Sequence, residues 1–169
     1  MEEVIEIASK IKDCLVSLCD FYCKLPNLIE LEHEFIRNHE FDKVREITMQ
    51  KNNIGDEIEV QFSVMRGLTE RISMKHAAIT NTLLQNSKAS GIRAIIDRLV
   101  DIKKCSKQDG MAGQVLDHLI EGLKEKLDLF DAKMIEIQPL VEMNKKVVGT
   151  MLTSYRESYR FWQELAEEN

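Results

Sequence analysis

The chain has 169 residues, of which 44% are hydrophobic and 31% are charged, with only 7 glycines and 2 prolines. Turns must therefore be few and helices long, and the composition predicts a single all-α domain that buries a core without metal or disulfides. The net charge of −6 argues against sequence-independent binding of nucleic acid, which needs Lys and Arg to replace counterions on phosphate.

No feature of the sequence predicts insertion into a membrane or passage across one. The chain opens with Met1-Glu2-Glu3, and no cationic start precedes an apolar run, so we expect no signal peptide. No segment approaches the ~20 apolar residues of a membrane span. We therefore expect a cytoplasmic protein whose four cysteines are reduced thiols.

The first apolar stripe keeps one helical phase from Val4 to Ile36. Pro26 interrupts it, and a proline removes a backbone donor and clashes with the preceding turn. The sequence therefore predicts a long first helix with a kink or a short break between Lys24 and Leu28.

A polar stretch at 38–40 ends this stripe, and Asp42 opens a second periodic run. The two runs predict a tight helical hairpin over residues 1–80. Lys51 falls in phase with the second stripe, where its methylenes can lie along apolar surface while the ammonium reaches water.

The middle of the chain is less regular. Residues 81–90 are rich in Asn, Thr, Gln and Ser and predict a loop, while residues 91–105 predict a short amphipathic helix. A linker is expected at 106–113, and residues 112–138 predict a long helix. Pro139 marks a kink or a boundary before the last helix.

Residues 140–167 predict a C-terminal amphipathic helix whose apolar stripe is rich in aromatic rings and holds the only tryptophan. Such rings anchor one helix in the groove of another, but they are equally good core residues. Asn144 lies on this stripe as either a polar residue that sets helix register or a buried amide satisfied by neighbouring backbone. The expected architecture is an antiparallel bundle of long, partly kinked helices in a single domain, 1–169.

One basic cluster stands out, although Asp97 and Asp101 interrupt it. A solvated helix face explains it better than phosphate binding does, because the whole chain is acidic. Its members are Lys88, Arg93, Arg98, Lys103, Lys104 and Lys107.

Catalytic and metal motifs are incomplete. Glu30 and His33 match half of a di-iron bundle signature, but no second copy occurs near the other histidines. Cys19, Cys23 and His39 could join His33 as zinc ligands, yet they lack the close C-x-x-C pair of most structural sites. No glycine-rich phosphate loop or nucleophile elbow is present, so we expect no enzyme, no metal and no cofactor.

Two separated stretches share a recognisable pattern. They are LEHEFI (31–36) followed by FDKVREI (41–47), Lys51, Ile54, Ile58 and Arg66, and LVEMNKKVVGTML (140–152). Taken together, they resemble the FlgN family of flagellar export chaperones, over residues 30–68 and 137–165.

This resemblance implies a cytoplasmic chaperone that holds the terminal helices of hook-filament junction proteins, FlgK-like and FlgL-like, before flagellar type III secretion. The last amphipathic helix of the family is where its clients are held. The resemblance therefore makes 140–167 a binding helix. The partner-binding residues it implies are Asn144, Val148, Met151, Leu152, Tyr155, Tyr159 and Trp162.

Two other functions stay open at the level of sequence. A structural helical-bundle module could use the same stripe to form a homodimer or to scaffold an assembly. A metal-dependent helical oxidase is the third alternative, and it depends on the half signature at Glu30 and His33.

Overall fold

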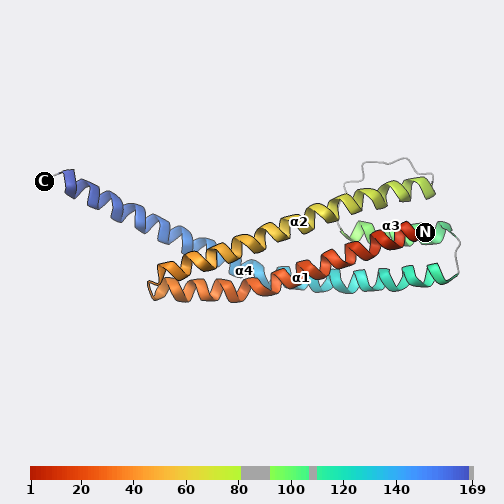
Figure 1. The fold of residues 1–169 in the computed structure, drawn as a ribbon, viewed down its shortest axis with the longest axis horizontal. Coiled ribbons are helices and arrows are strands. Elements are labelled where there is room, and N and C mark those ends of the chain that lie inside the picture. Colours follow the sequence, from red (N-terminus) through yellow and green to blue (C-terminus); the bar gives the residue numbers. More distant parts are fainter. Residues whose placement is uncertain (81–91, 107–109, 168–169) are drawn as a thin grey trace.

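The all-α class is confirmed by the computed structural model, which describes residues 1–80, 92–106 and 110–167 (Figure 1). The described residues form helices and no strand. The four helices are α1 (Glu2–Arg37), α2 (Phe41–Thr80), α3 (Ile92–Ser106) and α4 (Met111–Glu167). The loop expected at 81–90 lies outside the described residues, as does most of the linker expected before α4.

The helices do not all run antiparallel to their neighbours. α1 and α2 form the expected antiparallel hairpin, but α1 and α4 lie side by side in parallel. Tyr22 packs edge-on against Phe130 with ring centroids 5.5 Å apart, and eleven residues further along α1 His33 meets Asn144. The short α3 runs antiparallel to α4, with Lys103 paired to Asp117 and Arg93 to Asp131.

The bundle is thicker at one end than at the other. Where α3 lies against α2 and α4, all four helices contribute to one core, and residues such as Leu15, Ile72, Leu99 and Leu123 are completely buried. The half nearer the α1–α2 turn is built from α1, α2 and α4, because α3 does not reach it (Figure 1). Most of the apolar burial that stabilises the fold therefore lies in the four-helix half.

Neither proline ends a helix. Pro26 lies inside α1 and Pro139 inside α4, although a boundary was possible at each. Each proline costs a backbone hydrogen bond, about 3 kcal/mol in a helix interior. Packing near each proline offsets that cost: Ile29 is buried after Pro26, and Ile137 is buried before Pro139, with Val141 half-buried after it. The ranges 112–138 and 140–167 are consequently joined in one helix.

α4 is longer than the rest of the bundle. Its 57 residues correspond to ~85 Å at 1.5 Å per residue. Figure 1 shows its blue C-terminal part leaving the bundle beyond the α1–α2 turn. Within the described helices, no stretch combines the length and the apolar character that crossing a bilayer requires.

The cysteines are free thiols in two different environments. Cys14 and Cys19 are buried in the core, and burial raises the pKa of both thiols. Cys23 and Cys105 are exposed. Because the thiolate is the reactive form, we expect two thiols of the native protein to react rapidly with DTNB at pH 8. The other two should react only after unfolding in urea, and four equally fast thiols would contradict the packing of α1.

Candidate functional site

The turn between α1 and α2 is a tight helix cap. The His39 N–H donates to the Ile36 carbonyl at 3.2 Å, and the Glu40 N–H donates to the Phe35 carbonyl at 2.9 Å. These two bonds define a Schellman motif, whose C′ position requires a left-handed backbone. His39 occupies that position with φ = 58°. A histidine therefore stands where glycine would be unstrained.

Strained positions of this kind cost stability, and they cluster at sites where the side chain is needed. We expect His39→Gly to raise the free energy of unfolding by about 0.5–1 kcal/mol, because relief of the left-handed strain exceeds the added entropy of the unfolded chain. Urea denaturation measures the change. Asn38→Gly is the matched control, because Asn38 has φ = −87° and gains no relief; an equal stabilisation of both variants would contradict the assignment.

About two turns before this cap, α1 carries a buried carboxylate. Glu32 is 2% exposed and is the one charged residue buried among those the structure describes. The Lys51 ammonium pairs with its Oε2, and the Thr48 hydroxyl lies 3.1 Å from its Oε1. The same hydroxyl is 2.8 Å from the Val44 carbonyl, so its single proton is shared. Lys51, expected to reach water, instead ties α2 to α1.

The next residue of α1 makes a polar contact on the other side. His33 Nε2 lies 3.1 Å from Asn144 Oδ1 on α4. Asn144 is thus satisfied by a side chain rather than by neighbouring backbone. Together Glu32 and His33 connect α1 to both of its neighbours at one level of the bundle. We call Glu32, His33, Thr48, Lys51 and Asn144 the polar layer.

The inward face of α4 follows a heptad repeat, with alternating steps of three and four residues. Its a and d positions are buried or half-buried throughout the bundle, except Met134, which is 37% exposed. These positions are Leu116, Ile120, Leu123, Leu127, Phe130, Met134, Ile137, Val141, Asn144, Val148 and Met151. The spacing continues in the sequence through Tyr155, Ser158, Trp162 and Leu165.

α1 ends before this repeat does. Since His33 meets Asn144, 111 positions further along the chain, Arg37 at the end of α1 lies level with Val148. Beyond this level the a and d positions of α4 have no α1 beside them. The described side chains from Thr153 to Arg160 are exposed, as expected for a helix that has left its bundle. We call residues 152–167 the α4 tail. We call the a and d positions of α4 from Val148 onward, which begin just before the tail, the open seam.

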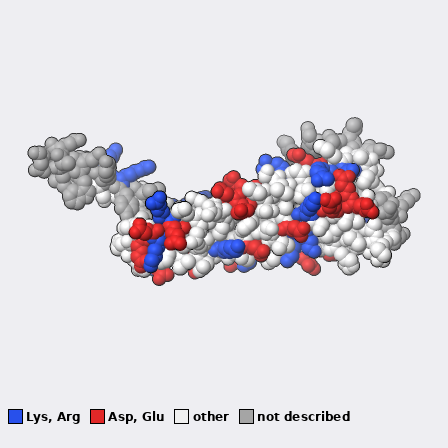
Figure 2. Space-filling model, in the orientation of Figure 1, with Lys and Arg blue, Asp and Glu red and all other residues white. Residues whose placement is uncertain are grey.

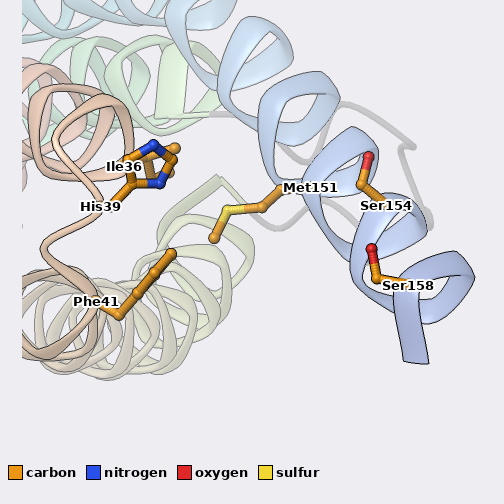
Figure 3. Close-up of a pocket in the computed structure, with 6 residues that line it drawn as sticks. All are labelled: Ile36, His39, Phe41, Met151, Ser154 and Ser158. Atoms are coloured by element: carbon orange, nitrogen blue, oxygen red, sulfur yellow. The ribbon is translucent and has the colours of Figure 1, made fainter. Parts of the chain in front are cut away.

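A pocket of about 270 Å³ lies where the open seam begins. Figure 3 shows Met151 pointing from α4 toward Phe41, with Ile36 and His39 beside them at the end of the hairpin. Ser154 and Ser158 of α4 complete the described lining. The walls are mainly apolar, and Phe41 is 46% exposed. We call this the tip pocket.

The chain matches no protein-family model, no curated protein and no solved structure.

The structure describes only part of the predicted binding face. Val148 and Met151 are half-buried at the start of the open seam, and Asn144 belongs to the polar layer rather than to an exposed face. The remaining predicted side chains lie outside the described residues, although their backbone is part of α4. They are Leu152, Tyr155, Tyr159 and Trp162.

Five of the six residues described at the tip pocket were not predicted as partner-binding residues: Ile36, His39 and Phe41 at the hairpin end, and Ser154 and Ser158 on α4. Ile36 and Phe41 occur in the motif that resembles FlgN, but the periodicity gave them no role beyond packing or opening a helix. His39 carried no local signal, because a left-handed histidine cannot be told from an ordinary turn residue by sequence.

The basic cluster is neutralised by carboxylates. Arg93 pairs with Asp131 at 2.6 Å, which with Asp128 raises the pKa of the guanidinium, and Lys103 pairs with Asp117. Figure 2 shows Lys and Arg lying among Asp and Glu over the visible face of the bundle. Lys88 and Lys107 lie outside the described residues. The solvated helix face is therefore the better explanation of the described members.

The described part of the chain does not bring together the ligands that the di-iron and zinc alternatives require. No three His, Cys, Asp or Glu side chains there lie close enough together to hold a metal ion. His33 is bonded to Asn144, Cys19 is buried in the core, and His39 lies at the turn.

Proposed function

We propose that this protein is an export chaperone resembling FlgN, which holds an amphipathic terminal helix of a hook-filament junction protein along the open seam before flagellar type III secretion. The observation that carries the proposal is that the heptad repeat of α4 continues beyond the level at which α1 ends. A helix whose apolar face continues past its own partner offers that face to another helix, in the helix-in-groove mode.

The tip pocket supports this use of the seam. It lies at the point where a client helix, following the course of α1, would meet the end of the hairpin. His39 keeps a strained backbone there and lines the pocket, although glycine would fit the turn better. Retained strain beside an apolar hollow is expected where the side chain contributes to binding.

The expected affinity suits a carrier. The open seam has five apolar positions, and burial of each at ~1.5–3 kcal/mol gives a gross gain of ~7–15 kcal/mol. Loss of translational freedom and ordering of the client offset part of it, by ~4 kcal/mol or more. A net gain of ~7–8 kcal/mol lies within the range that these figures allow, and it corresponds to a Kd of about 1–10 µM, from which the client can be released.

The single tryptophan gives a local reporter. A synthetic C-terminal helix of a FlgK-like or FlgL-like protein that contains no tryptophan should change the Trp162 fluorescence on titration, with a micromolar Kd. The double variant Tyr155→Ala/Trp162→Ala should bind at least 100-fold more weakly by calorimetry, since each aromatic anchor is worth ~2 kcal/mol or more.

Thr153→Ala is the matched control, because Thr153 is exposed and lies away from the seam on the same helix. It should leave the Kd unchanged within twofold. Absence of any binding to the unaltered protein, or equal weakening by Thr153→Ala, would overturn the chaperone proposal and favour the structural bundle module.

A further inference from the structure

We propose that, when no client is bound, a second copy of this chain covers the open seam, with the two α4 tails paired antiparallel and Trp162 of each copy placed at the tip pocket of the other. The pairing itself is independent of the proposed function; only its role as competitor of the client rests on that proposal.

The open seam is self-complementary in one antiparallel register. Its a positions are Val148, Tyr155 and Trp162, and its d positions are Met151, Ser158 and Leu165. When two tails are centred on a point between residues 156 and 157, every a position lies opposite a d position of the other copy. The pairs are Val148 with Leu165, Met151 with Trp162, and Tyr155 with Ser158, each made twice.

That register brings the largest ring to the pocket. Met151 lines the tip pocket, and Trp162 of the partner copy falls opposite Met151. The pocket's volume of about 270 Å³ is equivalent to about nine waters at ~30 Å³ each, ample for an indole. Ser154 and Ser158 line the same pocket and supply hydroxyl acceptors for the indole N–H, which needs a partner when buried.

A parallel pairing does not fit the same space. In the bundle, α1 packs alongside α4 as far as the level of Val148. In a parallel pair, the part of the partner's α4 that precedes its tail would need the same space beside α4, and it would collide with the hairpin turn at Ile36 to Phe41. An antiparallel partner instead approaches the hairpin only with the end of its tail, so the two bundles point away from each other.

Charge order favours the same direction. Lys145 and Lys146 open this part of α4, and Glu164 and Glu167 close it. Antiparallel tails place the basic turn of one copy level with the acidic turn of the other, whereas parallel tails place like charges together. Lys146 and Glu167 share the heptad position of Thr153, away from the seam, so this charge order biases the orientation at low ionic strength and adds little to affinity.

The area is sufficient for a stable pair. Tyr155 and Trp162 of each tail bury ~150–250 Å² apiece, which gives ~600–1,000 Å² for the two copies, and the apolar side chains of Val148, Met151 and Leu165 add to this area. Specific interfaces bury ~1,200–2,000 Å² in total.

The oligomeric state provides the first test. Sedimentation equilibrium of the full chain should give twice the mass of one chain at 50 µM and dissociation on dilution. Trp162→Glu should weaken the dimer at least 100-fold, and Thr153→Glu on the exposed back of the same helix should leave it unchanged. A monomer at all concentrations, or a dimer insensitive to Trp162→Glu, would overturn the proposal.

Spin labels at Lys146→Cys and Arg160→Cys test the direction, in a chain with Cys23→Ser and Cys105→Ser. With a 1.5 Å rise per residue, antiparallel tails place the two labels at 146 ~30 Å apart along the axis and those at 160 ~10 Å apart. Parallel tails give equal distances at both positions, which would refute the register. These distances are measured without a substitution in the seam, so misfolding of Trp162→Glu cannot mask the result.

The client titration separates this inference from the proposed function. A monomer that binds the junction-protein helix refutes self-pairing and leaves the chaperone proposal standing. A dimer of the expected register that does not bind the helix refutes the chaperone and keeps the pairing. If both hold, adding the peptide should convert the dimer into a complex of one chain with one peptide.

Discussion

Lys51→Met is expected to lower the free energy of unfolding by about 2–3 kcal/mol, although it keeps the length and apolar character of the side chain. The Glu32 carboxylate would remain buried, with the shared Thr48 hydroxyl as its remaining hydrogen-bond donor in the polar layer. Breaking a fully buried pair costs ~3–5 kcal/mol. The lower figure applies because the Lys51 side chain is 16% exposed, and water partly screens the loss.

Lys10→Met is the matched control. Lys10 pairs with Glu6 on the surface of α1, where the two side chains are 53% and 60% exposed. Exposed pairs one helical turn apart contribute ~0.3–0.5 kcal/mol, so this variant should lie within 0.5 kcal/mol of the unaltered chain. Urea denaturation followed by circular dichroism measures both. A similar small change for Lys51→Met would show that Glu32 is not held by Lys51.

Replacing both partners distinguishes a buried charge from a packing defect. Glu32→Leu/Lys51→Met removes the charge together with its counter-ion, and such replacements are often neutral or stabilising. We expect this double variant to regain at least the 2 kcal/mol lost by Lys51→Met alone. If it stays as unstable as the single variant, the loss comes from the lysine stem and not from the stranded carboxylate.

The helices could be predicted from sequence because the apolar phase is a local signal. The hairpin, the short α3 and the amphipathic α4 all follow from steps of three and four, and their bounds fall within one or two residues of the observed ones. The long first helix was predicted through Pro26, but the division of α4 at Pro139 was wrong, because local rules count the lost hydrogen bond and not the packing around it.

The site was less accessible because it depends on which helices meet. That α1 and α4 are parallel, and that α1 stops first, cannot be read from either helix alone. The same holds for Lys51 and Asn144, which each stood out as polar residues on an apolar stripe but had no identifiable partner. His39 required the backbone angle itself.

A chain ending at Leu152 should keep its stability and, if the chaperone proposal holds, lose its binding of the client helix. The deletion removes residues 153–169 but leaves Met151, which lines the tip pocket together with the hairpin end. The described side chains from Thr153 to Arg160 are exposed, so at a concentration low enough for the unaltered chain to be monomeric the free energy of unfolding should change by less than about 1 kcal/mol.

Binding of the junction-protein helix should fall more than 100-fold in the shortened chain, because the aromatic positions that supply most of the contact area are gone. Leu123→Ala is the complementary variant: Leu123 is fully buried in the same heptad of α4, so it should cost ~2–5 kcal/mol of stability without altering the Kd while the protein remains folded. One continuous repeat would then perform two separable tasks, divided at the level where α1 ends. If the shortened chain instead unfolds at a temperature several degrees lower, the tail packs on its own bundle. The seam would then not be open, and the proposal would fail.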